Sequence, residues 1–174
     1  MNNRAAISAK RGAAPVPSGI DLEAVANIAD TLTTLSADLF ALYIKTKNFH
    51  WHVSGPHFRD YHLLFDEQSE QLLAATDGMA ERVRKLGGVT LHSVGQIARL
   101  TRIADNDEPA VPALRMLEEL AEDNAQLARG LRGAHALCDK FGDVASASLI
   151  ENWIDETERR IWFLCETIRR DLDR

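Results

Sequence analysis

Residues 48–58 read Asn48-Phe49-His50-Trp51-His52-Val53-Ser54-Gly55-Pro56-His57-Phe58. Three of the six histidines of the chain lie between positions 50 and 57. Within this stretch, Ser54-Gly55-Pro56 predicts a break between two helices, because Gly and Pro favour turns and Pro suits a first helical turn. The stretch therefore predicts two helices joined by a short turn, with side chains that can ligate metal on both sides of it.

Amphipathic helices are predicted on both sides of this turn. Before it, apolar residues recur at spacings of three and four from Leu22 to Leu42, and Asp21 is a candidate N-cap, which predicts a helix over about 21–51. After it, a second helix is predicted over about 57–86, where Gly87-Gly88 ends it. A short turn between two long helices favours an antiparallel pair.

The rest of the chain predicts a second pair of helices. A long connection over 89–108 contains a candidate short helix from Ser93 to Leu100. Pro109 and Pro112 mark the start of the third long helix, and a fourth is capped by Asp143 and continues to the C-terminus. We therefore predict an all-α fold, a ferritin-like four-helix bundle over 21–174 with a short helix in its long crossover connection.

Composition places this chain among globular proteins. Its 174 residues are 45% hydrophobic and 26% charged, and no apolar run is long enough for a membrane helix. No secretory signal is evident, so we expect a cytoplasmic protein without a membrane partner, in which Cys138 and Cys165 stay reduced. Residues 1–20 hold three basic and no acidic side chains, and we interpret them as a flexible basic tail. Residues 21–174 hold 17 basic and 26 acidic ones, a net charge of −9.

Four potential metal ligands share one face of the second predicted helix. At ~100° per residue, Asp66, Asp77 and Glu81 lie within about 100° of His62. Asp66 and Asp77 are nevertheless separated by roughly 16 Å along the helix axis, too far for one ion to bridge. An antiparallel copy of the same helix, related by a two-fold axis near residues 71–72, would place Asp77 and Glu81 of its partner opposite His62 and Asp66.

The predicted metal site therefore combines two subunits. His50, near the end of the first helix, could join His62 and Asp66, while Asp77 and Glu81 come from the other subunit. Imidazoles mixed with carboxylates suit ferrous iron, and suit zinc or manganese less selectively. In the competing interpretation, His62 and Asp66 form a surface pair and Glu81 pairs with Lys85. The chain contains no Glu-x-x-His, so the single-chain di-iron site of other bundles is not expected.

These residues closely resemble the Dps family, the miniferritins. The family pattern is matched by His50-Trp51, Gly55, Phe58, His62, Asp66, Asp77-Gly78-Met79-Ala80-Glu81-Arg82 and Leu86-Gly87-Gly88. The specific match covers residues 45–90, and all five family ligand positions are intact.

The resemblance implies a ferroxidase in a hollow dodecamer. Ferrous iron would bind at sites on the two-fold interfaces and be oxidised by hydrogen peroxide in preference to oxygen. Ferric mineral would collect inside the shell, which protects DNA from oxidative damage. By the same match, Lys47 could pair with a ligand carboxylate and Trp51 could quench radicals. Acidic pores for iron entry would involve Asp143, with Asp139 a weaker candidate; Asp143 is equally a candidate helix cap.

DNA binding is the second function that the sequence allows. Some family members bind DNA through basic N-terminal tails, and this tail contains Arg4, Lys10 and Arg11. Twelve such tails on one particle could act together, through contacts that are independent of base sequence and sensitive to salt. The alternative reading is a nucleoid-associated particle that coats DNA, with metal binding secondary. A third is a bundle that holds zinc or manganese without redox turnover.

The remaining candidates are expected to be structural. His52 and His57 flank the site but are interpreted as surface residues, and His92 and His135 as ordinary surface or core histidines. Trp153 and Trp162 are expected in the core or an interface. The many Glu and Arg residues of the last two helices are expected mostly on solvated faces.

Overall fold

The computed structural model describes residues 19–172, and the regular structure in that range is entirely helical. Its helices are α1 (Leu22–His52), α2 (Phe58–Lys85), α3 (Val94–Leu100), α4 (Ala113–Lys140) and α5 (Val144–Leu172). This confirms the predicted fold of four long helices with a short helix in the crossover. The bounds predicted for α1 and α2 differ from the observed ones by one residue at each end.

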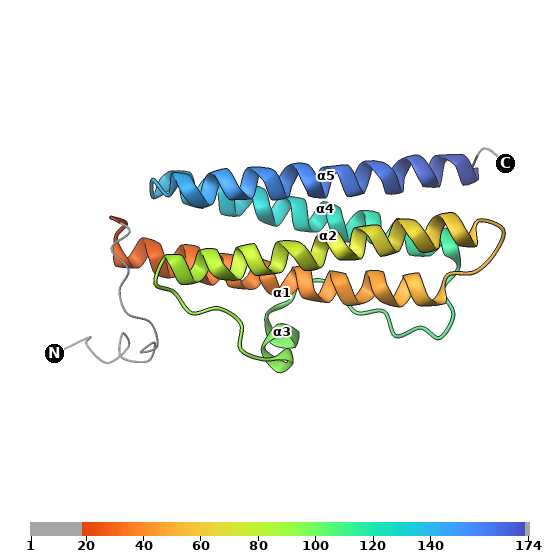
Figure 1. The fold of residues 1–174 in the computed structure, drawn as a ribbon, viewed down its shortest axis with the longest axis horizontal. Coiled ribbons are helices and arrows are strands. Elements are labelled where there is room, and N and C mark those ends of the chain that lie inside the picture. The colour runs from red at the N-terminus through yellow and green to blue at the C-terminus, as the bar shows by residue number, and fades with distance from the viewer. Residues whose placement is uncertain (1–18, 173–174) are drawn as a thin grey trace.

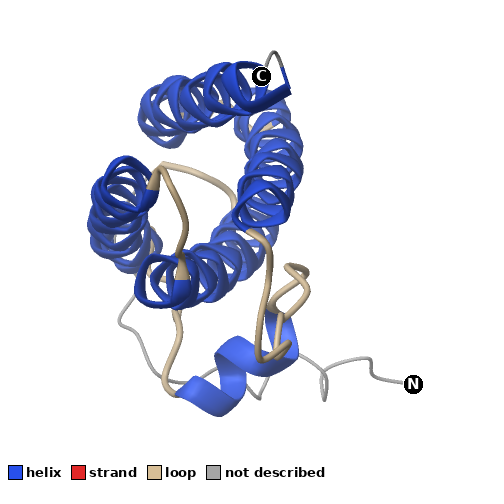
Figure 2. Cartoon of the chain, turned by 90° about the vertical axis from the view of Figure 1, so that its right-hand side faces the viewer, coloured by secondary structure: helices blue, strands red, loops and turns tan. Residues whose placement is uncertain are grey.

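The four long helices form two antiparallel pairs (Figure 1). α1 packs along α2, and α4 packs along α5, while α2 and α5 contact each other least. The α1–α2 turn and the α4–α5 turn lie at opposite ends of the bundle. The short helix α3 lies outside the bundle and contacts α1 (Figure 2). One face of α2 therefore stays free of other helices of the described chain.

Local sequence determines where the first two helices begin and end. The Asp21 carboxylate caps α1 by accepting a hydrogen bond from the Glu23 backbone N–H at 2.8 Å. At the α1–α2 turn, Gly55 has a φ of +113°, a conformation that side chains with a Cβ rarely adopt. The Gly55 carbonyl then accepts a hydrogen bond of 3.1 Å from the backbone N–H of Phe58, the first residue of α2.

Apolar side chains from all four long helices form a single core. Its largest fully buried members are Ile28, Leu32, Leu35, Leu42, Phe49, Phe65, Leu72, Met79, Met116, Leu117, Leu120 and Leu127. Ile28, Leu32, Leu35 and Leu42 lie on the apolar stripe predicted for the first helix, and Ile150 and Leu164 of α5 also belong to the core. The helical periodicity of the sequence therefore accounts for the interior of the bundle.

The long crossover is anchored to α1 by a buried carboxylate. Asp38 is buried and accepts hydrogen bonds from the backbone N–H of Arg102 at 2.6 Å and from its guanidinium at 2.5 and 3.0 Å. The guanidinium passes so close to Gly130 of α4 that a Cβ there would lie 2.9 Å from it. Further along, the Asn48 amide donates to the Asn106 carbonyl at 3.2 Å. The crossover is thus held against α1 up to the end that carries His50.

Arg160 of α5 is an exception to the expectation that the Glu and Arg residues of the last two helices lie mostly on solvated faces. It is 3% exposed, and it donates hydrogen bonds to Asn124 at 2.8 Å and Thr157 at 2.7 Å. Its Nη1 is buried without a hydrogen-bond partner among the described residues. Burial lowers the pKa of this guanidinium to about 10. Helical periodicity places Arg160 on the inner face, but residue type alone predicted the outer one.

Candidate metal centre

His50 at the end of α1 and His62 in the second turn of α2 lie against each other. Their rings stack with centroids 3.8 Å apart and planes inclined by 22°. The Nδ1 atom of His50 is 2.8 Å from the backbone oxygen of His62, and the Nδ1 atom of His62 is 2.8 Å from the backbone oxygen of His50. We call this reciprocal arrangement the histidine clasp. It brings together two of the predicted ligands across the α1–α2 turn.

The clasp determines which ring nitrogens are available for metal. A backbone carbonyl can only accept a hydrogen bond, so each Nδ1 must carry the proton. In the neutral imidazole, Nε2 then has a free lone pair, which is the form that ligates a metal ion. Histidine ligands in metalloproteins commonly donate their other ring N–H to a backbone carbonyl in this way, which fixes both tautomer and orientation. The clasp therefore leaves both Nε2 atoms unprotonated in the neutral imidazoles.

Asp66 adds a carboxylate to the two histidines. One of its oxygens, Oδ1, lies 3.8 Å from Nε2 of His50 and accepts a hydrogen bond from the ammonium of Lys47. The hydrogen bond from Lys47 is the largest of the effects that lower the pKa of Asp66; partial desolvation opposes it, and the charge of His50 adds to it. Asp66 is therefore ionised at neutral pH, with an amine as its counter-charge in the single chain.

Asp77 and Glu81 lie further along α2 and do not meet the histidines within one subunit. Both side chains are exposed, and Glu81 accepts a hydrogen bond of 3.0 Å from Lys85. This pair is the one that the competing interpretation expected, although exposed i,i+4 pairs contribute little stability. Among the described residues of the single chain, no group of three or more His, Cys, Asp or Glu is arranged to hold a metal ion.

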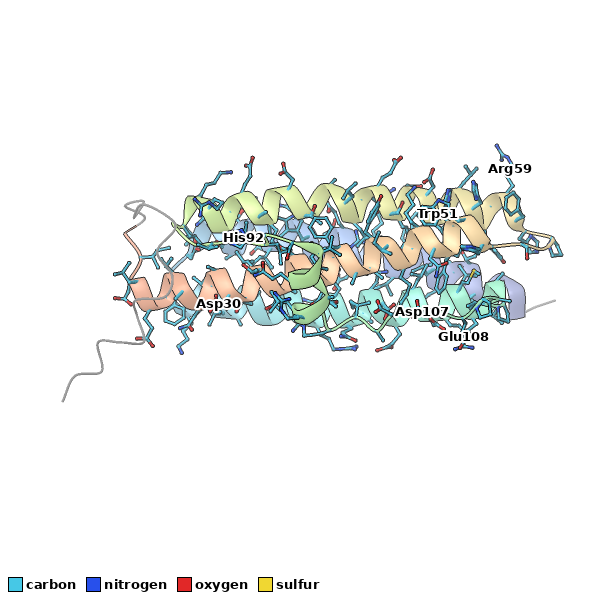
Figure 3. All side chains as sticks on the ribbon, turned by 90° about the horizontal axis from the view of Figure 1, so that it is seen from below. Asp30, Trp51, Arg59, His92, Asp107 and Glu108 are labelled. Carbon is cyan, nitrogen blue, oxygen red and sulfur yellow. The ribbon has the colours of Figure 1, made fainter. Side chains whose placement is uncertain are left out.

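Two exposed aromatic side chains, Trp51 and Phe58, lie near the α1–α2 turn. Trp51 is 62% exposed at the end of α1, and Figure 3 shows it at the same end of the bundle as Arg59. Phe58 is 46% exposed, and its ring centroid lies 5.0 Å from that of His62. Sequence reasoning used Phe58 only as a motif position and missed this contact. Its i,i+4 spacing from His62 was the available signal.

Asp143 serves as a helix cap in the described chain. It is 2% exposed and accepts hydrogen bonds from the Ser146 backbone N–H at 3.1 Å and from the Arg82 guanidinium at 2.5 Å. Of the two roles that the sequence left open, the contacts favour the cap over a pore carboxylate, because the charge is buried and already paired. Asp139 is exposed, and it lies 3.2 Å from Nδ1 of His135.

The other histidines lie outside the clasp. His52 is exposed, and its Nδ1 lies 2.8 Å from the Asn48 carbonyl. His57 occupies the N-cap position of α2 without a side-chain capping hydrogen bond. His92 is exposed in the long connection, as Figure 3 shows. The Nε2 atom of His135 lies 3.0 Å from Glu151 of α5.

Several other sequence-based expectations can be compared with the structure. Cys138 and Cys165 are both free, and burial raises the pKa of the Cys138 thiol to about 11. Trp153 is partly buried against the core, whereas Trp162 is 61% exposed. No helix in the described part of the chain is long and apolar enough to cross a membrane. The candidate DNA-binding residues Arg4, Lys10 and Arg11 lie outside the described residues.

The chain is similar to known proteins in both sequence and fold. A family model described as a ferritin-like domain matches residues 29–172. An uncharacterised low-temperature-induced protein of Nostoc sp. is 36% identical over 129 residues, which cover 74% of this chain and 72% of that protein. The DNA protection during starvation protein of Halobacterium salinarum is 30% identical over 142 residues, 80% of this chain and 76% of that one. The crystal structure of a Dps protein from Bacillus brevis superposes with a TM-score of 0.82 at 26% identity, covering 86% of this chain and 99% of that one.

Proposed function

The chain belongs to the Dps family of ferritin-like proteins, and we propose that it is a miniferritin that binds and oxidises ferrous iron at sites shared between two subunits. The histidine clasp is the observation that carries this proposal. It holds two imidazoles in the tautomer that leaves each Nε2 ready to bind metal, beside an ionised carboxylate. A surface histidine pair without a binding role would not require both rings to be fixed in this way.

A second copy of the chain supplies the ligands that one subunit lacks. Asp77 and Glu81 are exposed on the face of α2 that no other helix of the described chain covers, and Asp66 is half-buried beside α1. The exposed Leu73 lies on the same face between Asp66 and Asp77. Antiparallel pairing of two such faces would bring Asp77 and Glu81 of each subunit to the clasp and Asp66 of the other. The result is two identical sites per dimer.

The ligand set suits iron as a substrate. Two imidazoles and three carboxylates match the nitrogen and oxygen donors that ferrous iron accepts, and anionic oxygens favour the ferric product. In the reaction, two ferrous ions and one hydrogen peroxide take up two protons and give two ferric ions and two water molecules. Zinc or manganese would bind the same donors without redox turnover, so metal binding alone does not establish a ferroxidase.

At the level of the particle, we propose a cytoplasmic dodecamer that stores ferric iron and protects DNA during oxidative stress. Oxidation by peroxide rather than oxygen removes both reactants that generate hydroxyl radicals. The support is the family relationship together with the need for a second subunit at each site. Storage also requires a closed shell, because soluble ferric ions otherwise precipitate.

The first experiment loads the protein with ferrous iron under anaerobic conditions and then adds a pulse of hydrogen peroxide. Absorbance follows ferric iron, and light scattering follows particle size. Rapid oxidation with iron retained in a soluble particle of ~12 subunits supports the proposal. Oxidation no faster than in a protein-free control, with iron precipitating, would contradict it.

Direct DNA binding is the second candidate function. It is favoured by the basic composition of residues 1–20 and opposed by the net charge of −9 on the remaining chain. Retention of DNA that falls steeply with salt and disappears on deletion of residues 1–19 would support it. A full-length protein that retains no DNA even at low salt would exclude it.

A further inference from the structure

Three rings meet where α1 and α2 adjoin. His62 stacks on His50 with ring centroids 3.8 Å apart, and Phe58 lies 5.0 Å from His62 with its plane inclined by 33°. Phe58 and His62 are four residues apart on α2, so their side chains share one face of the helix. His62 is therefore the middle ring, in contact with both His50 and Phe58.

Phe58 is held in place by the turn that precedes it. Its backbone N–H donates to the carbonyl of Gly55, whose φ of +113° closes the turn between α1 and α2. With 46% of its surface exposed, Phe58 is not a core residue, although phenylalanine is normally buried. Its position is better explained by its ring contact with His62 than by packing in the interior.

His62 is the member of the clasp that needs this support. His50 is 9% exposed and enclosed by the bundle, whereas His62 is only partly buried. The terminal torsion of a histidine has broad, roughly two-fold preferences, so a half-turn of the ring exchanges Nδ1 with a carbon atom. That half-turn would break the hydrogen bond to the His50 carbonyl, and water could then satisfy both partners.

We propose that Phe58 is a positioning residue that keeps the His62 ring in the clasp, with Nδ1–H on the His50 carbonyl and Nε2 free for metal. The flat face of the ring restricts rotation of the imidazole by an offset aromatic contact. This inference rests on the proposed function, because it assigns Phe58 a role in metal binding through His62. It concerns a residue that contributes no ligand atom itself.

The test compares three substitutions of Phe58 with a control. Phe58→Tyr keeps the ring, Phe58→Leu keeps apolar bulk without a ring, and Phe58→Ala removes both. Phe141→Ala removes a partly buried ring at the α4–α5 turn, at the opposite end of the bundle (Figure 1). Light scattering first establishes that each variant assembles as the wild type does.

Two measurements on the metal-free and cobalt-loaded particles follow. Solid-state NMR of protein with ¹⁵N-labelled histidine reports the tautomer of His62 without any metal. Titration with cobalt(II), a spectroscopic substitute for ferrous iron, reports affinity and ligand geometry from its visible absorption. We expect Phe58→Ala and Phe58→Leu to populate both tautomers of His62 and to bind cobalt about tenfold more weakly, as loss of a supporting contact typically does. Phe58→Tyr and Phe141→Ala should match the wild type.

The outcomes separate this inference from the proposed function. Wild-type affinity and an unchanged His62 tautomer in both Phe58→Ala and Phe58→Leu would overturn the positioning role while leaving the metal site intact. Should the wild type itself fail to bind cobalt, the proposed function would be overturned, and with it the role of Phe58. A Phe58→Leu protein as good as Phe58→Tyr would also overturn the role, because it would show that apolar bulk suffices.

Discussion

The ammonium of Lys47 on α1 donates a hydrogen bond to the carboxylate of Asp66 on α2. Lys47 lies one helical turn before His50, and Asp66 lies one turn after His62, so this ion pair spans the two helices beside the histidine clasp. The ammonium of Lys47 is therefore bound to a carboxylate that the proposed site needs as an iron ligand. Lys47 lowers the pKa of Asp66 and holds it ionised while no metal is bound.

Replacement of Lys47 by Met should make the free energy of unfolding depend less on pH in the acidic range. Because Lys47 lowers the folded-state pKa of Asp66, its contribution is present above the ordinary value of 3.8 and is lost as pH falls through the lowered pKa. Methionine at position 47 carries no charge and cannot provide this contribution at any pH. We expect Lys47→Met to lower the free energy of unfolding at pH 7 by less than about 1 kcal/mol, because Asp66 is partly exposed.

The measurement is thermal unfolding from neutral pH to below 3.8, compared with Lys85→Met, which removes an exposed i,i+4 pair on α2. The difference in unfolding temperature between Lys47→Met and the wild type should become smaller as the pH is lowered. A difference that stays constant over the whole range would show that Lys47 acts through packing rather than through the charge of Asp66.

Removal of both clasp histidines should abolish rapid iron oxidation without preventing assembly. In the His50→Ala, His62→Ala double variant, the site loses both nitrogen ligands, and we expect oxidation by peroxide to slow at least about tenfold. The assay records ferric absorbance together with light scattering. The exposed His92 provides the control substitution. An intact rate in the double variant would remove these residues from the site.

Particles assembled from two inactive subunits should recover activity. With His62→Ala and Asp77→Ala subunits mixed in equal amounts, each site takes His50, His62 and Asp66 from one chain and Asp77 and Glu81 from another. Random pairing then leaves roughly a quarter of the sites with a full set of ligands. The rate of oxidation in the mixture should therefore exceed that of either parent. If no mixing ratio restores activity, each site is built within one subunit.

The buried Arg160 should reduce the stability of the bundle. Its charge is desolvated, and its described partners, Asn124 and Thr157, are neutral. Arg160→Met should raise the free energy of unfolding by about 1–2 kcal/mol, since an apolar side chain of similar length removes the buried charge. The denaturant midpoint measures this, with the exposed Arg159→Met as control. A lower midpoint would show that the two hydrogen bonds outweigh desolvation.

The same residue predicts a stability change at alkaline pH. Because burial lowers the folded-state pKa of Arg160 from its ordinary range to about 10, the destabilising cost of its buried charge is full below pH 10 and falls as pH rises above it. The advantage of Arg160→Met over the wild type should therefore decrease above pH 10. An advantage that grows with pH would contradict a desolvated guanidinium as its cause.

Much of the fold was predictable because long helices leave a periodic record in the sequence. Leu22 to Leu42 repeat at helical spacing, and Gly55 and Gly87 fall where helices end. The anchoring of the crossover by Asp38 and Arg102 was not predictable, because those residues are 64 positions apart and nothing local relates them. The burial of Arg160 was missed for a related reason, since its charge argued for a surface position.

The candidate site was predictable in part. Spacing along α2 placed His62 and Asp66 on one face. In the structure, both side chains lie next to His50. The histidine clasp was not predictable, because it depends on how two backbone carbonyls, one on α1 and one on α2, face the opposite helix once the two helices pack together. The placement of Asp77 and Glu81 opposite a partner's histidines stays a prediction, since it depends on a second subunit.

The histidine clasp also has a consequence for the order in which a working particle matures. Its two residues are only 12 positions apart and lie on the hairpin nearest the N-terminus, so closing it costs little chain entropy and needs nothing from α4 or α5. The nitrogen half of the proposed site can therefore form on a single chain during synthesis. The remaining carboxylates, Asp77 and Glu81, arrive only by encounter with another subunit. Iron turnover would then depend on protein concentration, and a newly made, solitary subunit would be inert.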